Sequence, residues 1–129
     1  MKKEIKRLPD SELAVMMVLW DAGEAVTSSY VCDKLKNKKN WKITSVLTFL
    51  SRLAKKGFVS VERKGRENIY TAKIFENEYL QRENKSFLEK LYGNSLTAFV
   101  SSLYDSKAIS EDDLNELKEF LDKAGKGER

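Results

Sequence analysis

The densest cluster of reactive side chains in this 129-residue sequence is basic and lies between residues 36 and 66. That window holds ten lysine and arginine residues and one acid, Glu62. Ammonium and guanidinium groups at this density bind polyanions, and the phosphate backbone of nucleic acid is the most common such ligand. The pattern therefore indicates binding rather than catalysis.

The residue types that most enzymes and metal sites require are scarce. Histidine is absent, which removes the most common general base and metal ligand. Cys32 is the only cysteine, so neither an intrachain disulfide nor a thiolate cluster can form. We expect no enzyme activity, no cofactor and no metal. Cys32 is interpreted as a small apolar residue inside a helix rather than as a redox sensor.

Charge differs between the two halves of the chain. Residues 1–72 contain 15 basic and 8 acidic residues, whereas residues 73–129 contain 9 and 12. A basic module is thus followed by an acidic one, which suggests two different tasks. No apolar run approaches the roughly 18 residues needed to cross a bilayer, so we expect a cytoplasmic protein without membrane insertion.

One predicted helix, over 44–56 and ending before Gly57, would position much of the basic charge. Its apolar arc consists of Val46, Phe49, Leu50, Leu53 and Ala54. The opposite arc consists of Thr44, Ser45, Thr48, Ser51, Arg52 and Lys55, with Leu47 at the border and Lys56 at the C-terminal end.

Two alternating runs, 58–63 and 68–72, flank a turn at 64–67 and predict a β-hairpin with a basic tip. Two further helices are predicted upstream. The first covers 11–22 and ends at Gly23; Pro9 and Asp10 mark its start, since proline is tolerated in a first turn and the aspartate can cap. Its apolar stripe comprises Leu13, Met16, Met17 and Trp20. The second covers 27–37, with Thr27 or Ser28 as its cap.

Helix, helix, polar-faced helix and basic hairpin is the order of a winged helix-turn-helix. The major groove of DNA admits one helix, whose exposed face must offer hydrogen-bonding groups to bases and cations to phosphates. The hairpin would reach flanking phosphates or the minor groove. The predicted DNA-binding residues are Lys42, Thr44, Ser45, Thr48, Arg52, Lys55, Arg63, Lys64 and Arg66. A winged-helix module that docks proteins instead of DNA is the alternative.

The second half predicts three helices, over 75–92, over 95–105 and after a Ser110 cap. Their apolar residues exceed what so short a segment can bury by itself, so they must pack on the winged domain or self-associate. We favour a homodimer. The predicted dimerisation residues are Phe87, Leu91, Leu96, Phe99, Val100, Leu103, Leu117 and Leu121.

The expected fold class is therefore mainly α with a small β-hairpin wing. The expected domains are a DNA-binding domain of residues 1–73, a helical dimerisation domain of 74–124, and a frayed tail of 125–129.

With these motifs in place, nearly the whole chain resembles the penicillinase and methicillin-resistance repressors of Gram-positive bacteria. In the first predicted helix the matching residues are Leu8, Glu12, Val15, Met16, Leu19 and Trp20. In the polar-faced helix and the hairpin they are Trp41, Thr44, Val46, Thr48, Leu50, Arg52, Leu53, Lys55, Lys56, Gly57, Lys64, Gly65, Arg66 and Tyr70. Further matches are Ser86, Phe87, Leu88, Tyr92 and the helix start at 110–117.

The resemblance implies a homodimeric repressor that binds palindromic operator DNA and is inactivated through a membrane sensor and an induction protease. Two positions depart from the family pattern. Leu47 stands where relatives often have Arg, Lys or Gln, which suggests a different base preference. Ser102 and Leu103 stand at the family's scissile bond, where relatives have Asn and an aromatic residue, so they form a weak candidate proteolytic site.

Overall fold

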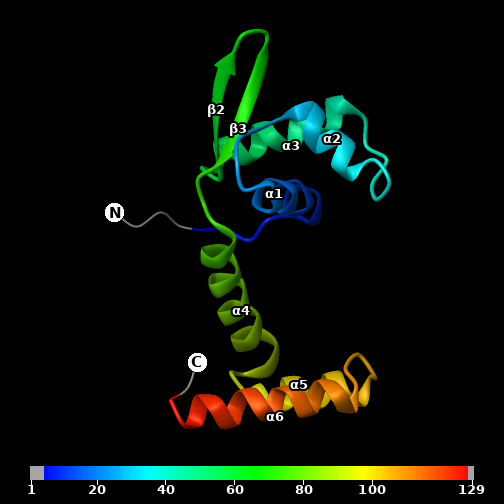
Figure 1. The fold of residues 1–129 in the computed structure, drawn as a ribbon, viewed down its shortest axis with the longest axis vertical. Coiled ribbons are helices and arrows are strands. Elements are labelled where there is room, and N and C mark those ends of the chain that lie inside the picture. Colours follow the sequence, from blue (N-terminus) through cyan, green and yellow to red (C-terminus); the bar gives the residue numbers. More distant parts are fainter. Residues whose placement is uncertain (1–4, 128–129) are drawn as a thin grey trace. The chain divides into compact units, whose positions relative to one another are not determined.

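The computed structural model describes residues 5–127 and contains six helices and one small sheet (Figure 1). The helices are α1 (Asp10–Ala22), α2 (Ser28–Leu35), α3 (Ile43–Lys55), α4 (Glu76–Tyr92), α5 (Leu96–Asp105) and α6 (Glu111–Gly125). The strands are β1 (Val26–Thr27), β2 (Val59–Lys64) and β3 (Glu67–Ala72). The chain divides into two compact units, of which the first ends at Glu83 and the second begins at Asn84. The predicted mainly α fold with a hairpin wing is confirmed.

Helices α1, α2 and α3 and the sheet enclose the core of the first unit (Figure 1). The α3 side chains Val46, Leu50 and Leu53 are completely buried. They form the middle of the predicted apolar arc, and Phe49 and Ala54 pack beside them. The rest of the buried cluster is Leu8, Val15, Met16, Leu19, Val26, Val31, Leu35, Phe58, Val59, Tyr70, Ile74 and Tyr79.

The ends of the helices follow local capping chemistry. The Thr27 hydroxyl accepts a hydrogen bond from Tyr30 N at 3.1 Å, so Thr27 is the cap of α2. Gly23 ends α1 in the left-handed conformation, with φ of 68°. The predicted capping role of Asp10 is wrong, because Pro9 occupies the cap position and Asp10 is the first helical residue. Helix α2 is also shorter than the predicted 27–37.

The apolar stripe predicted for α1 is only partly correct. Helix α1 buries Glu12, Val15, Met16 and Leu19, whereas Met17 is 49% exposed. The core face thus lies one residue away from the predicted stripe and includes a carboxylate. Because Glu12 is charged, a pattern of apolar residues alone could not identify this face.

The wing is an antiparallel pairing of β2 and β3, in register from Val59 opposite Ala72 to Lys64 opposite Glu67. Both strands reach further into the turn than predicted, so only two residues join them. Gly65, with φ of 66°, occupies the first of these positions, as such tight turns require. Strand β1 was not predicted; it adds two residues to the other edge of β3.

The first unit includes the start of α4, because Tyr79 completes its core. Tyr79 is 2% exposed, and its hydroxyl accepts a hydrogen bond from Leu8 N at 2.9 Å. Its ring packs beside Trp20 and Phe58, with centroid separations of 5.7 and 5.9 Å. The functional boundary at 73/74 stays a prediction, but the packing of the first unit continues beyond it.

The second unit has a different character, since no side chain among residues 84–127 is fully buried. Its packing centres on Phe87, Tyr92 and Phe99, whose ring centroids lie 5.3–5.9 Å apart. Ser110 caps α6 in a reciprocal arrangement with Asp113, as predicted for the serine. Of the predicted frayed tail, Gly125 is the last residue of α6, and residues 128–129 lie outside the described residues.

Candidate nucleic-acid interface

The polar arc of α3 is exposed because the opposite arc is buried. Thr44, Thr48, Arg52 and Lys55 are all exposed, and Ser45 is half-buried. Lys42 is exposed at the cap position of the same helix. A rigid helix therefore carries six of the predicted DNA-binding residues, with the hydroxyls toward its start and two cations near its end.

Two details of α3 affect what it can recognise. The Thr48 hydroxyl donates to Thr44 O at 3.0 Å, so it offers only its lone pairs to an outside donor. Leu47 is 41% exposed beside this arc and can make apolar contacts only.

Arg52 and Lys55 lie in the last turn of α3. Their positive charges interact favourably there with the negative end of the helix dipole. Neither forms an ion pair with a carboxylate within residues 5–127. Both cations are thus available to an external anion.

Lys56 follows this face at the C-terminal end of α3 and has a different partner. Its ammonium forms an ion pair with Glu12, whose side chain is 2% exposed. Lys56 therefore joins the end of α3 to α1, while its side chain stays 34% exposed. Sequence reasoning missed the pair because its members lie 44 residues apart.

The wing presents the remaining predicted residues. Arg63, Lys64 and Arg66 are exposed, and the free end of the hairpin projects beyond the three helices (Figure 1). The Arg63 Nε donates to Gly65 O at 3.2 Å, which holds this guanidinium beside the turn. The predicted residues therefore occupy two surfaces of one unit, a helix face and a hairpin tip.

Two further features are absent from the part of the chain that the structure describes. Within residues 5–127, no group of three or more potential carboxylate or thiolate ligands is placed to hold a metal ion. None of the helices there is long and apolar enough to cross a membrane.

The sequence of this chain matches a known protein family over most of its length. The family model described as penicillinase repressor matches residues 8–123. The chain belongs to the penicillinase repressor family. The match spans both compact units, so the resemblance seen in the sequence is confirmed for the whole length of the fold.

Two relatives illustrate the range of the family. The penicillinase repressor of Bacillus licheniformis is 31% identical over 120 residues, covering 93% of this chain and 93% of the relative. The methicillin resistance regulatory protein MecI of Staphylococcus aureus strain N315 is 23% identical over 123 residues, covering 95% of this chain and 99% of the relative.

Solved structures agree for the winged-helix part. The DNA-binding domain of the repressor BlaI superposes with a TM-score of 0.52 at 33% identity, covering 60% of this chain and 94% of that domain. A monomeric form of Bacillus licheniformis BlaI, solved with the blaP half-operator, gives a TM-score of 0.50 at the same identity and the same coverage.

The candidate proteolytic site lies inside α5. Ser102 O accepts a hydrogen bond from Ser106 N at 3.1 Å, and the Ser102 hydroxyl accepts one from Tyr92 at 3.4 Å. The bond between Ser102 and Leu103 is therefore held in helical backbone, which a protease would have to unwind locally before cutting.

Proposed function

We propose that this protein is a dimeric, sequence-specific transcriptional repressor that binds operator DNA. The observation that carries the proposal is the α3 face, on which hydroxyls and unpaired cations lie opposite a fully buried apolar arc. Family membership supports the same function, because the relatives are penicillinase and methicillin-resistance regulators. The BlaI structure with a half-operator supports DNA as the ligand of this winged fold.

Within this proposal, α3 enters the major groove. Thr44, Ser45 and Thr48 lie near its start, the part of a recognition helix that contacts base edges. Arg52 and Lys55 bind phosphates at its other end. The wing residues Arg63, Lys64 and Arg66 bind flanking phosphates or the minor groove, and Lys42 adds a phosphate contact at the helix start.

The second unit supplies the dimer contacts. Because none of its described side chains is fully buried, a large apolar surface is left for a second copy. Leu91 is 66% exposed and Leu121 is 50% exposed, and Phe87 and Leu96 are exposed as well. The partly covered residues Phe99, Val100, Leu103 and Leu117 lie on the same helices. A two-fold dimer presents two α3 helices to the half-sites of a palindrome.

The test measures binding of the protein to DNA from upstream of its own gene, against random duplex of equal length, at several salt concentrations. We expect tighter binding to the former and a linear fall of log affinity with log salt. Arg52→Ala with Lys55→Ala (R52A/K55A) should reduce the slope by about 0.9 for each phosphate that the variant no longer binds. The matched control is Lys85→Ala with Lys90→Ala, an equal charge change at exposed positions of α4.

Equal affinity for both duplexes would contradict the proposal. So would an R52A/K55A protein that binds DNA like the control and no longer binds a protein partner. The latter result would establish the docking module as the function of this winged helix.

A further inference from the structure

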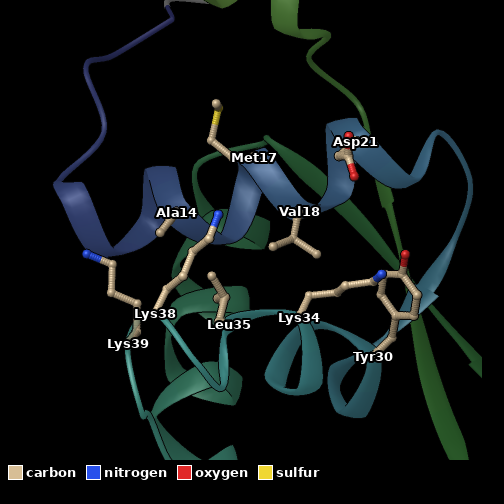
Figure 2. A pocket seen from close by; sticks show the side chains of 9 residues that line it. All are labelled: Ala14, Met17, Val18, Asp21, Tyr30, Lys34, Leu35, Lys38 and Lys39. Carbon is tan, nitrogen blue, oxygen red and sulfur yellow. The ribbon is translucent and has the colours of Figure 1, made fainter.

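A groove between α1 and α2 takes no part in the proposed operator contacts. It is lined by nine residues of α1, α2 and the turn after α2, and its volume is about 480 Å³ (Figure 2). Small-molecule sites in proteins have volumes of roughly 300–1,000 Å³. The groove therefore has the capacity for a small ligand.

The walls of the groove are apolar. Figure 2 shows Ala14 and Val18 pointing from α1 toward α2, with Leu35 on the facing helix. Met17 also lines the groove, and its side chain is 49% exposed. A flexible thioether at such a position adapts to the shape of an apolar ligand.

The rim of the groove is positively charged at one end. Lys38 and Lys39 come from the turn after α2, and the backbone N–H groups of both donate to Leu35 O, at 3.0 and 2.8 Å. These bonds fix the turn, and Figure 2 shows Lys38 extending across the groove toward α1. Neither lysine forms an ion pair within the described residues. Lys38 thus reaches the groove without a carboxylate partner, whereas the Lys39 ammonium lies 5.8 Å from the centroid of the Trp41 ring.

The opposite end of the groove has a different composition. Asp21 lies at the far end of α1, and Tyr30 and Lys34 lie below it on α2 (Figure 2). The Lys34 ammonium lies 5.4 Å from the centroid of the Tyr30 ring, so a cation–π contact already occupies it. An anion is therefore attracted to the Lys38 end and repelled from the Asp21 end.

We propose that this groove binds a small organic carboxylate with an apolar ring. The ring lies between α1 and α2 against Ala14, Val18 and Leu35, and the carboxylate lies at Lys38. Charge complementarity selects this occupant, because Ala14, Val18 and Leu35 supply apolar contacts and the group that crosses the groove at one end is the Lys38 ammonium (Figure 2). The proposal is independent of operator binding, since none of the predicted base or phosphate contacts lines the groove.

The test uses naphthoate as the probe and naphthalenemethanol as the same ring without the charge. Both are titrated into the isotopically labelled full chain, and heteronuclear NMR spectra report the amides that shift. We expect saturable shifts at residues 14, 18 and 35 with naphthoate. The alcohol should bind roughly fivefold more weakly, since it cannot form the partly exposed ion pair with Lys38.

Matched variants separate this site from general charge effects. Lys38→Gln with Lys39→Gln (K38Q/K39Q) should weaken naphthoate binding by roughly fivefold. Lys85→Gln with Lys90→Gln makes the same charge change on α4 and should bind naphthoate like the unaltered protein. All four lysines are exposed, so these variants retain the fold.

Three results would overturn the proposal. The first is equal affinity for the acid and the alcohol, or equal affinity of both double variants for naphthoate. The second is a set of shifts confined to residues 84–127. The third is a shift of residues 14, 18 and 35 that follows protein concentration without any probe, which would show that a second copy fills the groove.

Discussion

Glu12 is the one charged side chain that is buried in the core among residues 5–127. A buried carboxylate is costly unless a cation and hydrogen bonds compensate it. Lys56 supplies that compensation from the cap position of α3, while its neighbour Lys55 points to solvent. Two adjacent lysines thus have separate roles, one in holding α3 on α1 and the other in the proposed DNA contact.

We predict that Lys56→Met lowers the stability of the first unit by about 1–3 kcal/mol, because the Glu12 carboxylate loses its partner while Lys56 is only partly buried. Lys55→Met is the matched control and should change stability by less than about 0.5 kcal/mol. Urea unfolding followed by tryptophan fluorescence measures both, since Trp20 and Trp41 both belong to the first unit.

The two lysines should also separate in DNA binding. Lys55→Met should weaken binding to operator DNA, whereas Lys56→Met should retain it under conditions where the protein is folded. Equal stability of the two variants would show that the ion pair with Glu12 contributes nothing to the fold.

Tyr79 makes the stability of the first unit sensitive to alkali. Burial raises the pKa of its hydroxyl above the ordinary value of 10.0, and the hydrogen bond from Leu8 N opposes part of this rise. The unfolded chain then loses this proton at lower pH than the folded chain. The contribution of Tyr79 is therefore complete below pH 10 and is lost as pH rises through the folded-state pKa.

We predict that Tyr79→Phe destabilises the first unit by about 1–3 kcal/mol near neutral pH, because Leu8 N loses its buried acceptor. The difference between the two proteins should shrink above pH 10, where only the unaltered protein loses the tyrosine contribution. Urea unfolding from neutral pH to well above pH 10 measures the difference. A difference that stayed constant over this range would contradict the assigned effect of burial.

At the scale of the elements, the sequence predicts helix boundaries well where caps, glycines and apolar periodicity set them. The boundaries of α3, α4 and α5 are correct to within one residue, because Gly57, Ser95 and the apolar periodicity mark them in the sequence. Strand β1 escaped prediction, since two residues have no period and are strand only through pairing with β3. The Glu12–Lys56 pair was also not predicted, because glutamate and lysine are typical of an ordinary solvated surface.

For the proposed DNA-binding face of α3, the sequence likewise predicted one part correctly and not the other. Sequence periodicity correctly separated the exposed arc of α3 from its buried arc, because burial follows the helical repeat. Periodicity could not show that the Thr48 hydroxyl already donates to Thr44 O, or that Lys56 pairs with Glu12. Those facts depend on side-chain geometry and on contacts with a distant helix.

Thr27 acts in two elements, as the cap of α2 and as the partner of Ile69 in the sheet. We predict that Thr27→Ala destabilises the first unit by about 1 kcal/mol through loss of the cap. Thr27→Ser retains the hydroxyl and should restore most of this stability. Ser29→Ala, an exposed position in the same helix, is the control. Unfolding monitored by tryptophan fluorescence would refute the capping role if Thr27→Ala and Thr27→Ser were equally stable.

At the scale of the whole molecule, charge and apolar surface are divided between the two units. The cations of the predicted DNA-binding residues belong to the first unit, and the most exposed leucines of the second unit belong to the proposed dimer contact. Residues 73–129 carry an excess of acid, so under the proposed function this part of the chain is not expected to compete for DNA. Affinity for an operator then depends on how many α3 helices one particle carries.

We predict that Leu91→Glu with Leu121→Glu converts the protein to a monomer, because four carboxylates would be buried at a two-fold contact. Sedimentation measures the mass of the particle. Operator affinity should fall by roughly a hundredfold or more as the linked half-site contacts separate. Val61→Glu, at an exposed apolar position of β2, is the control and should sediment like the unaltered protein.

A double variant that still sediments as a dimer would place the contact elsewhere. Circular dichroism should show unchanged helix content, since Leu91 and Leu121 are already exposed in the single chain.

The hydrogen bond between Leu8 and Tyr79 joins residues 71 positions apart, and this has a consequence during synthesis. Tyr79 leaves the ribosome 24 residues after Lys55, the end of α3, and seven residues after Ala72, the end of β3. Until then the nascent chain lacks the ring that packs against Trp20 and Phe58, and its apolar core stays open to solvent or chaperones. The first unit therefore completes its core only after translation has entered α4.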